Sequence, residues 1–351
     1  EEKRYSLSST QFELAKERDP KDPTPWFYDA IQKQTQNRPV EALWDIQKSI
    51  ELNNNRAVYR SKFLLDRDEA ARGSSLARIF ENLGFERRAV METAKSLSFD
   101  PANHSAHRFL SDTYANTPRH EAARVSELLQ AQLLQPINVN PVQPHMAVAD
   151  LNIITGTGPS AAGFNEFTSI MERSKPQLVA SGVVGSNGSL GNEMVLSKFN
   201  ERTSISLGQF HYESNGFRTN NDQNHDILNA FVQHAVTTKL NVQAEVRSRS
   251  SDQGNLLQNF DKPSDDPMDP QNRIRRKIED DVVRLGVKYD LSTNQHIIAS
   301  GLFNDKRLEQ IILPTERQHT LDNSNIQGYQ TEIQYHYRNQ QFSVIAGSGI
   351  F

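Results

Sequence analysis

The stretch that decides the fold of the second half of the chain is residues 240–249, which read Leu240-Asn241-Val242-Gln243-Ala244-Glu245-Val246-Arg247-Ser248-Arg249. Up to position 246 every second side chain is apolar, and the side chains between them are polar or charged. Successive side chains of a β-strand point to opposite faces of a sheet. The alternation therefore predicts a strand with one apolar face and one charged face.

The same alternation recurs from residue 177 to the end of the chain. In residues 328–338 the apolar set Tyr329, Ile333, Tyr335 and Tyr337 alternates with the polar set Gln330, Glu332, Gln334, His336 and Arg338. We predict nine strands in this region, at about residues 177–185, 192–200, 203–213, 226–237, 240–250, 280–290, 295–304, 328–338 and 341–351.

The lengths of the predicted strands and of their connections favour an antiparallel membrane barrel over a soluble sandwich, which also alternates. Most strands exceed the usual length of about 5–6 residues and suit a tilted membrane crossing. Short turns near 200–203, 238–240, 291–295 and 338–341 alternate with long polar loops at 214–226, 251–279 and 305–327. Short periplasmic turns and long external loops are typical of outer-membrane barrels.

In such a barrel the charged face lines a wet interior, whereas in a soluble sheet it faces solvent. The predicted lumen-lining residues are Glu245, Arg247, Arg249, Arg284, Lys288, Glu332, His336 and Arg338. Some aromatic residues fit either an interfacial girdle or a core, namely Phe210, Tyr212, Phe231, Tyr289 and Phe303. Because bacterial barrels normally have an even number of strands, we expect this one to be incomplete and to continue beyond Phe351.

Residues 1–136 have the period of helices and turns marked by proline. Ala89 and Ala123 are 34 positions apart, and Asn54 follows Pro20 by 34. A period of 34 indicates a helix–turn–helix repeat, although residues 56–72 interrupt it and an ordinary helical bundle is the alternative. The expected packing residues are Trp26, Ala30, Ala42, Ala77, Phe80, Ala89, Pro101, Leu110, Tyr114 and Ala123. The chain begins within a repeat, so we expect further repeats before it.

Residues 137–175 form an extended connector between these two domains, of residues 1–136 and 176–351. Prolines at 136, 141 and 144 keep its first part extended. The Gly-rich segment 155–160 lacks the lysine of a phosphate loop, and Pro159 removes a backbone donor, so a turn is the better interpretation.

Composition and motifs exclude several classes of function. The 351 residues carry a net charge of -4, which gives no basic field for nucleic acid, and contain no cysteine. No apolar run is long enough for a transmembrane helix. Hydrolase, metalloprotease and phosphate-loop motifs are missing, so we predict no enzyme, no cofactor and no metal. The acidic loop 261–270 is an alternative Ca²⁺ site, but it lacks the spacing and the turn glycine of a calcium loop, so a solvated loop is the preferred interpretation.

The order of these parts resembles that of bacterial outer-membrane proteins that join periplasmic tetratricopeptide repeats to a C-terminal barrel. Exopolysaccharide export porins and surface-lipoprotein assembly modulators share this plan. Segments such as Gly208–Glu213 and Ala244–Arg247 look like parts of TonB-dependent-receptor-like barrels. The connector is too short for the plug domain of a TonB-dependent receptor, so energised uptake is not expected.

The resemblance implies an α+β multidomain protein of the Gram-negative outer membrane, with its first domain in the periplasm. It implies a transport or export pore whose repeats recruit a periplasmic protein or cargo, with membrane lipid around the barrel. The alternative is an assembly scaffold that binds proteins and passes no solute. Neither the residues nor the resemblance indicates the substrate, the pore size or the oligomeric state.

Overall fold

The computed structural model describes residues 4–115, 121–135, 176–256, 273–312, 319–339 and 342–350. Helices precede an antiparallel sheet, so the predicted α+β class is confirmed. The chain divides into two compact units, a helical unit built on residues 1–136 and a second unit that contains most of the sheet. The connector 137–175 and the acidic loop 261–270 lie outside the described residues.

Consecutive helices of the first unit pack against each other in chain order. Their bounds are α1 (Tyr5–Arg18), α2 (Pro23–Thr35), α3 (Pro39–Glu51), the 3-10 helix η1 (Asn53–Val58), α4 (Lys62–Asn82), α5 (Glu86–Phe99), α6 (His104–Ala115) and α7 (Glu121–Leu134). Local chemistry sets several ends. Proline at the first position starts α2 and α3, where no backbone donor is needed, and Gly84, with φ of +82°, follows α4.

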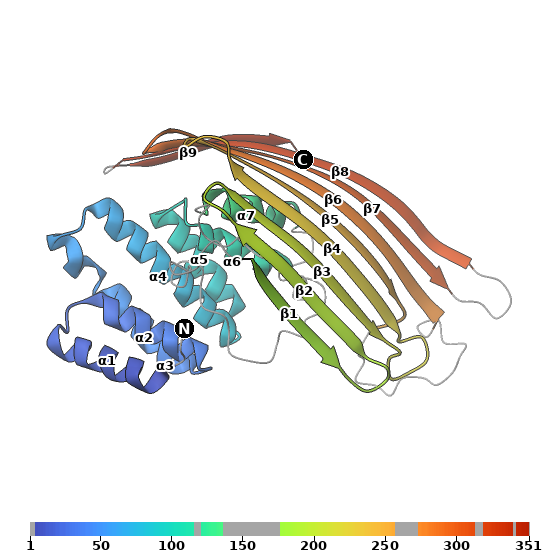
Figure 1. Ribbon diagram of the computed structural model, residues 1–351, viewed down its shortest axis with the longest axis horizontal. Coiled ribbons are helices and arrows are strands. Elements are labelled where there is room, and N and C mark those ends of the chain that lie inside the picture. The colour runs from blue at the N-terminus through green and yellow to red at the C-terminus, as the bar shows by residue number, and fades with distance from the viewer. Residues whose placement is uncertain are drawn as a thin grey trace. The chain divides into compact units, whose positions relative to one another are not determined.

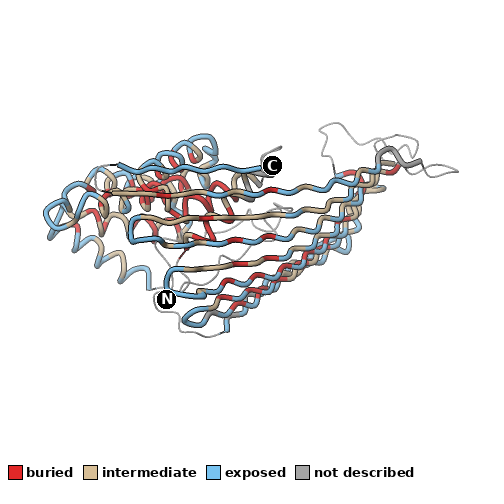
Figure 2. The backbone as a smooth tube through the Cα atoms, turned by 90° about the horizontal axis from the view of Figure 1, so that it is seen from above, coloured by how far each residue is buried: buried red, intermediate tan, exposed pale blue. Residues whose placement is uncertain are grey.

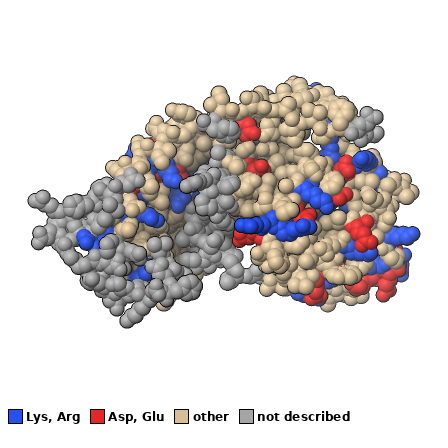
Figure 3. Space-filling model, turned by 180° about the vertical axis from the view of Figure 1, so that it is seen from behind, with Lys and Arg blue, Asp and Glu red and all other residues tan. Residues whose placement is uncertain are grey.

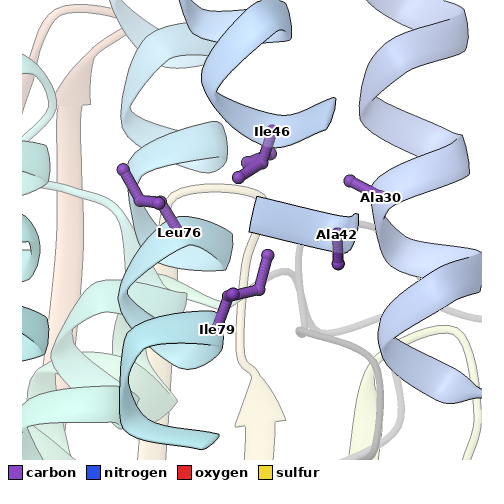
Figure 4. Packing of buried hydrophobic residues seen from close by; sticks show 5 residues of the cluster. All are labelled: Ala30, Ala42, Ile46, Leu76 and Ile79. Carbon is purple, nitrogen blue, oxygen red and sulfur yellow. The ribbon is translucent and has the colours of Figure 1, made fainter. Parts of the chain in front are cut away.

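Small side chains let these helices approach closely. Ala30 of α2 and Ala42 of α3 are fully buried, and they pack with Ile46, Leu76 and Ile79 in one apolar cluster (Figure 4). Ala77 and Ala89 are fully buried beside Phe109 in a second cluster. Both clusters therefore form around alanines that the sequence singled out as packing positions.

The other expected packing residues are less uniform. Phe80 borders both clusters, and Leu110 is buried. Four others are only partly buried, namely Trp26, Pro101, Tyr114 and Ala123.

Residues 56–72, which the sequence predicts to interrupt the repeat, are largely helical. They form the end of η1 and the first half of α4, a continuous helix of 21 residues. Arg56 and Arg60 both bind the carboxylate of Asp68, with N–O distances of 3.1 and 2.6 Å. The extra residues thus lengthen α4, and the ion pairs of Asp68 with Arg56 and Arg60 hold the start of this helix against the end of η1.

Nine strands form one antiparallel sheet in which neighbours in the chain are neighbours in space (Figure 1). They are β1 (Gln177–Val184), β2 (Leu190–Phe199), β3 (Thr203–Ser214), β4 (Gln223–Ala235), β5 (Leu240–Gln253), β6 (Ile274–Ser292), β7 (Gln295–Ile312), β8 (His319–Arg338) and β9 (Ser343–Ile350). Within the described residues the sheet does not close on itself, and β1 and β9 are its two edges.

The nine predicted strands are all present, but three of them are longer than predicted by eight or nine residues. The strands β6, β7 and β8 contain 19, 18 and 20 residues and extend far into the segments 251–279 and 305–327 that were expected to be loops. In β6 and β7, charges on both faces hide these extensions from a hydrophobic pattern. In the register of β6 and β7, Lys277 lies opposite Glu309 and Glu279 opposite Arg307, and such opposite charges stabilise a strand pair.

Candidate functional site

The sheet buries its polar face and exposes its apolar face. In β5 the carboxylate residue Glu245 is 4% exposed, whereas its neighbour Val246 is 54% exposed. The same alternation of buried and exposed positions follows β3 and β4 (Figure 2). A soluble sheet with one covered face buries the apolar side chains instead, so the arrangement is inverted.

Strand register carries the apolar face across the sheet. One row runs from Leu196 through Leu207, Ala230 and Val246 to Val283. We define the apolar face by the exposed apolar residues Leu178, Met194, Leu196, Ile205, Leu207, Leu228, Val232, Val246, Val283, Leu285, Val287, Tyr289 and Phe303. The rings of Phe303 and Tyr329 stack at 6.2 Å between neighbouring strands.

The polar face is the opposite side of the same strands. We define it by the buried residues Ser197, Ser204, Ser206, Asn229, Gln233, Gln243, Glu245 and Arg284 and by the positions in register with them. The hydroxyl oxygens of Ser204 and Ser206 are buried and have no hydrogen-bond partner among the described residues. Buried polar groups are normally hydrogen-bonded, and water is the usual partner where the protein provides none.

A buried ionic group lies at the centre of the polar face. Glu245 of β5 and Arg284 of β6 are directly opposite each other, and the guanidinium of Arg284 binds the Glu245 carboxylate. The side-chain amide of Asn229 on β4 donates to the same carboxylate at 2.6 Å. A buried carboxylate needs such partners, because removing a charge from water is costly. The group links three neighbouring strands.

The structure brings together five of the predicted lumen-lining residues. Glu245, Arg247 and Arg249 lie at alternate positions of β5, and the register places Arg284 and Lys288 of β6 on the same face. The other three predicted residues, Glu332, His336 and Arg338, share one face of β8, where His336 is buried.

For five aromatic residues the sequence did not decide between an interfacial girdle and a core, and the register now divides them between the two faces. Phe210, Tyr212 and Phe231 are buried on the polar face, whereas Tyr289 and Phe303 are exposed on the apolar face. The buried residues Val195, Phe210, Tyr212 and Ile227 form an apolar patch there, with Val183 packed against them. Sequence reasoning missed this patch. The signal that could have found it is the alternation within β3. Phe210 occupies an even position, as Ser204 and Ser206 do, and therefore lies on the same face as these serines.

The helical unit contains a separate buried charge cluster that the sequence analysis did not identify. Lys16 of α1, Asp29 and Lys33 of α2 and Asp45 of α3 form ion pairs, with a Lys33–Asp29 distance of 3.0 Å. Burial opposes the ionisation of Asp29, but hydrogen bonds from Lys16 and Lys33 outweigh it and lower its pKa. Burial raises the pKa of Asp45. The two cations balance the two carboxylates, so the cluster is not a charged site. It joins three helices instead.

Two features are absent from the part of the chain that the structure describes. Its His, Cys, Asp and Glu side chains form no group of three or more that could hold a metal ion. None of its helices combines the length and the apolar composition needed to cross a membrane. The polar face of the sheet is therefore the candidate site with the most specific arrangement.

Comparison of the chain with protein-family profiles, with curated proteins and with solved structures gave no match.

Proposed function

We propose that this chain is an outer-membrane pore protein, in which the sheet is part of a transmembrane barrel and the polar face lines its lumen. The observation that carries the proposal is the inverted burial of the sheet, with Glu245 and Arg284 buried and Leu207 and Val246 exposed. Water disfavours a large contiguous apolar surface, by about 25 cal/mol per Å². Lipid chains solvate such a surface, while a wet lumen solvates the polar face.

The banded pattern of the apolar face supports this environment. On β5 the apolar positions run from Leu240 to Val246, which at about 3.4 Å per residue is roughly 20 Å along the strand. Beyond this band the same face becomes charged, with Asp281 and Asp305 opposite each other. A transmembrane barrel likewise has an apolar band, about 25 Å tall along the membrane normal, with aromatic residues at its limits, and its strands cross this band at a tilt of about 35–45°. Phe303 adjoins Asp305, at the charged limit of the band.

We further propose that the helical unit is a tetratricopeptide-like repeat array in the periplasm that recruits a protein partner or cargo. The buried alanines at equivalent positions of α3 and α5, Ala42 and Ala89, support the repeat. Two positions after each alanine an apolar side chain is exposed, Trp44 at 68% and Met91 at 63%. These two exposed residues also favour the second candidate function, a membrane-anchored scaffold that binds proteins without transporting a solute.

Single cysteines on β5 test the membrane environment directly, because the chain has none of its own. Ala244→Cys and Val246→Cys place a label on the apolar face, and Gln243→Cys and Arg247→Cys are matched controls on the polar face. In liposomes we expect a fluorophore at 244 or 246 to be quenched by nitroxide lipids. Labels at 243 and 247 should instead be quenched by a water-soluble agent. Equal exposure of both sets to water would contradict the membrane sheet.

Conductance separates the two candidate functions. We expect the native protein with its barrel complete to produce stepwise ion currents in planar lipid bilayers. Lipid quenching at 244 and 246 without any current would instead support the scaffold.

A further inference from the structure

A hollow lies in the apolar face over β1 to β5. Its volume is about 720 Å³, within the range of about 300–1,000 Å³ in which proteins bind small molecules. Ala230 of β4 lines it, directly opposite Leu207 of β3 on one side and Val246 of β5 on the other. The face is indented here because the methyl group of Ala230 is smaller than the side chains around it. These side chains are aliphatic, namely Leu178, Met194, Leu196, Leu207, Leu228 and Val246.

Two polar side chains mark one end of the hollow, Gln209 of β3 and Ser248 of β5. In the register they are the neighbours of Leu228 on β4. Two positions further along the strands, the next row on this face contains His211 and Asp226, directly opposite each other. The hollow therefore leads from an aliphatic part of the face, past an amide and a hydroxyl, to a charged limit. A phospholipid has its acyl chain, ester linkage and headgroup in the same order.

Carboxylates dominate the charged limit of the hollow. Nδ1 of His211 lies 2.7 Å from the carboxylate of Asp226, and its Nε2 lies 3.9 Å from the carboxylate of Glu213. These three groups keep a net negative charge whether or not the imidazole is protonated. Lys198 of β2 is on the same face, but it lies beyond the hollow on the side away from His211. On the surface drawn in Figure 3, by contrast, cationic groups lie side by side with carboxylates.

Other cations near this limit are bound to groups outside it. Arg275 of β6 binds the carboxylate of Asp252 at 2.6 Å, and Lys277 lies directly opposite Asp252 in the register. Arg218, in the loop after β3, donates to the backbone oxygen of Asn255 at 3.0 Å. The two carboxylates beside the imidazole therefore give this limit of the hollow its charge.

We infer that the hollow binds one phospholipid whose headgroup ends in a primary ammonium, as that of phosphatidylethanolamine does. Its acyl chain fills the space over Ala230, and the amide of Gln209 and the hydroxyl of Ser248 donate to its ester oxygens. Its ammonium donates to Asp226 and Glu213, and such charge-assisted hydrogen bonds are stronger than those between neutral groups. The inference rests on the proposed membrane sheet, and it adds one specific lipid to that sheet.

Quenching by nitroxide-labelled lipids tests the inference in the native protein with its barrel complete, reconstituted in phosphatidylcholine vesicles. A fluorophore on Val232→Cys, two positions from Ala230 on the same face, reports the hollow. A fluorophore on Val287→Cys, on the same face of β6, reports the bulk lipid. Labelled phosphatidylethanolamine, phosphatidylcholine and phosphatidylglycerol are added in turn at the same low mole fraction.

At position 232 we expect phosphatidylethanolamine to quench at least twofold more than phosphatidylcholine, whose quaternary headgroup has no N–H donor. Phosphatidylglycerol, which is anionic, should quench least. At position 287 the three lipids should quench alike, because no hollow lies there to distinguish them.

Substitutions assign the preference to the hollow and to its charged limit, with the label at position 232. Ala230→Leu fills the hollow and should abolish the preference, whereas Ala244→Leu makes the same change on the same face outside the hollow and should leave it unchanged. Asp226→Asn with Glu213→Gln should lower quenching by phosphatidylethanolamine to that by phosphatidylcholine. Asp305→Asn, on the same face of β7, is the matched control and should have no effect.

Equal quenching by the three lipids at position 232 would overturn the lipid site while leaving the membrane sheet intact. Stronger quenching by phosphatidylglycerol would overturn the preference for an ammonium. A lack of quenching by any lipid at both positions would overturn the membrane sheet and the inference with it. These outcomes need only the two labelled proteins, so they decide the inference even if the double carboxylate variant fails to fold.

Discussion

Arg72 shows how the helical unit accommodates a cation in its interior. Its side chain is buried, its Nε donates to the hydroxyl of Ser49 at 2.8 Å, and a second nitrogen donates to the amide oxygen of Asn53. The guanidinium also lies 5.5 Å from the ring centre of Phe27. Burial lowers the pKa of Arg72 to about 10, so the group stays charged at neutral pH. Two neutral acceptors and an aromatic ring thus hold α2, α3 and α4 around one charge.

His104 makes the helical unit sensitive to acid. Burial, followed by the nearby His107 and Arg67, lowers its pKa from 6.5 to about 4. Between pH 6.5 and 4, His104 is protonated in the unfolded chain but largely neutral in the folded unit. The free energy of unfolding therefore decreases as the pH falls through this window. The loss is at most about 3 kcal/mol at pH 4.

Urea unfolding at pH 7.5, 5.5 and 4.5, followed by tryptophan fluorescence, measures this dependence, because both tryptophans, Trp26 and Trp44, lie in the helical unit. We expect His104→Gln to flatten the dependence. His211→Gln, in the sheet, is the control and should leave it unchanged. An equally steep dependence without His104 would assign the acid sensitivity to other groups.

At the scale of elements, the long hairpin of β6 and β7 depends on charge pairing where it lacks apolar alternation. Glu279 and Arg307 are opposite each other, with 3.7 Å between their charged groups. We expect Glu279→Arg to place like charges across the strands and to destabilise this end of the hairpin by about 0.2–1 kcal/mol. The exchanged pair, Glu279→Arg with Arg307→Glu, should restore it.

Amide hydrogen exchange of residues 274–281 and 305–312 measures the effect. Faster exchange in the single variant and recovery in the double variant are the expected results. If the double variant exchanges as fast as the single one, charge pairing does not hold this end of the hairpin.

The same hairpin shows how far sequence reasoning reaches. A period of two predicted all nine strands, because side chains on opposite faces differ in polarity in segments such as 240–246. It missed the ends of β6 and β7, where both faces are charged and only the register reveals complementary neighbours. Alanines at corresponding positions of the repeat predicted the packing of α3 and α5, but the repeat did not predict the extra length of α4.

The candidate site was predicted to a similar extent. The parity of β5 placed Glu245, Arg247 and Arg249 on one face from the sequence alone. The partnership of Glu245 with Arg284 and Asn229 depends on which residues the register places opposite each other. The charge cluster of Lys16, Asp29, Lys33 and Asp45 was missed because its members come from three helices.

At the scale of the whole molecule, the two units have different sources of stability. The helical unit rests on small apolar clusters around alanine, whereas the sheet is a continuous ladder of hydrogen-bonded strands. We expect urea to unfold the helical unit first. Tryptophan emission should shift to the red at urea concentrations that leave the β-sheet circular dichroism of the full chain in detergent unchanged. Coincident transitions of both signals would show a single cooperative unit instead.

The two edges of the sheet have a consequence for how it grows. Along β1 and β9, within the described residues, one side of the backbone has no neighbouring strand. Such a border is a template, because an extended segment adds to it through main-chain hydrogen bonds whatever its sequence. The two faces nevertheless restrict which segments can add, because only a segment whose side chains alternate between apolar and polar continues both faces. Growth one hairpin at a time, in either direction, is thus built into the sheet.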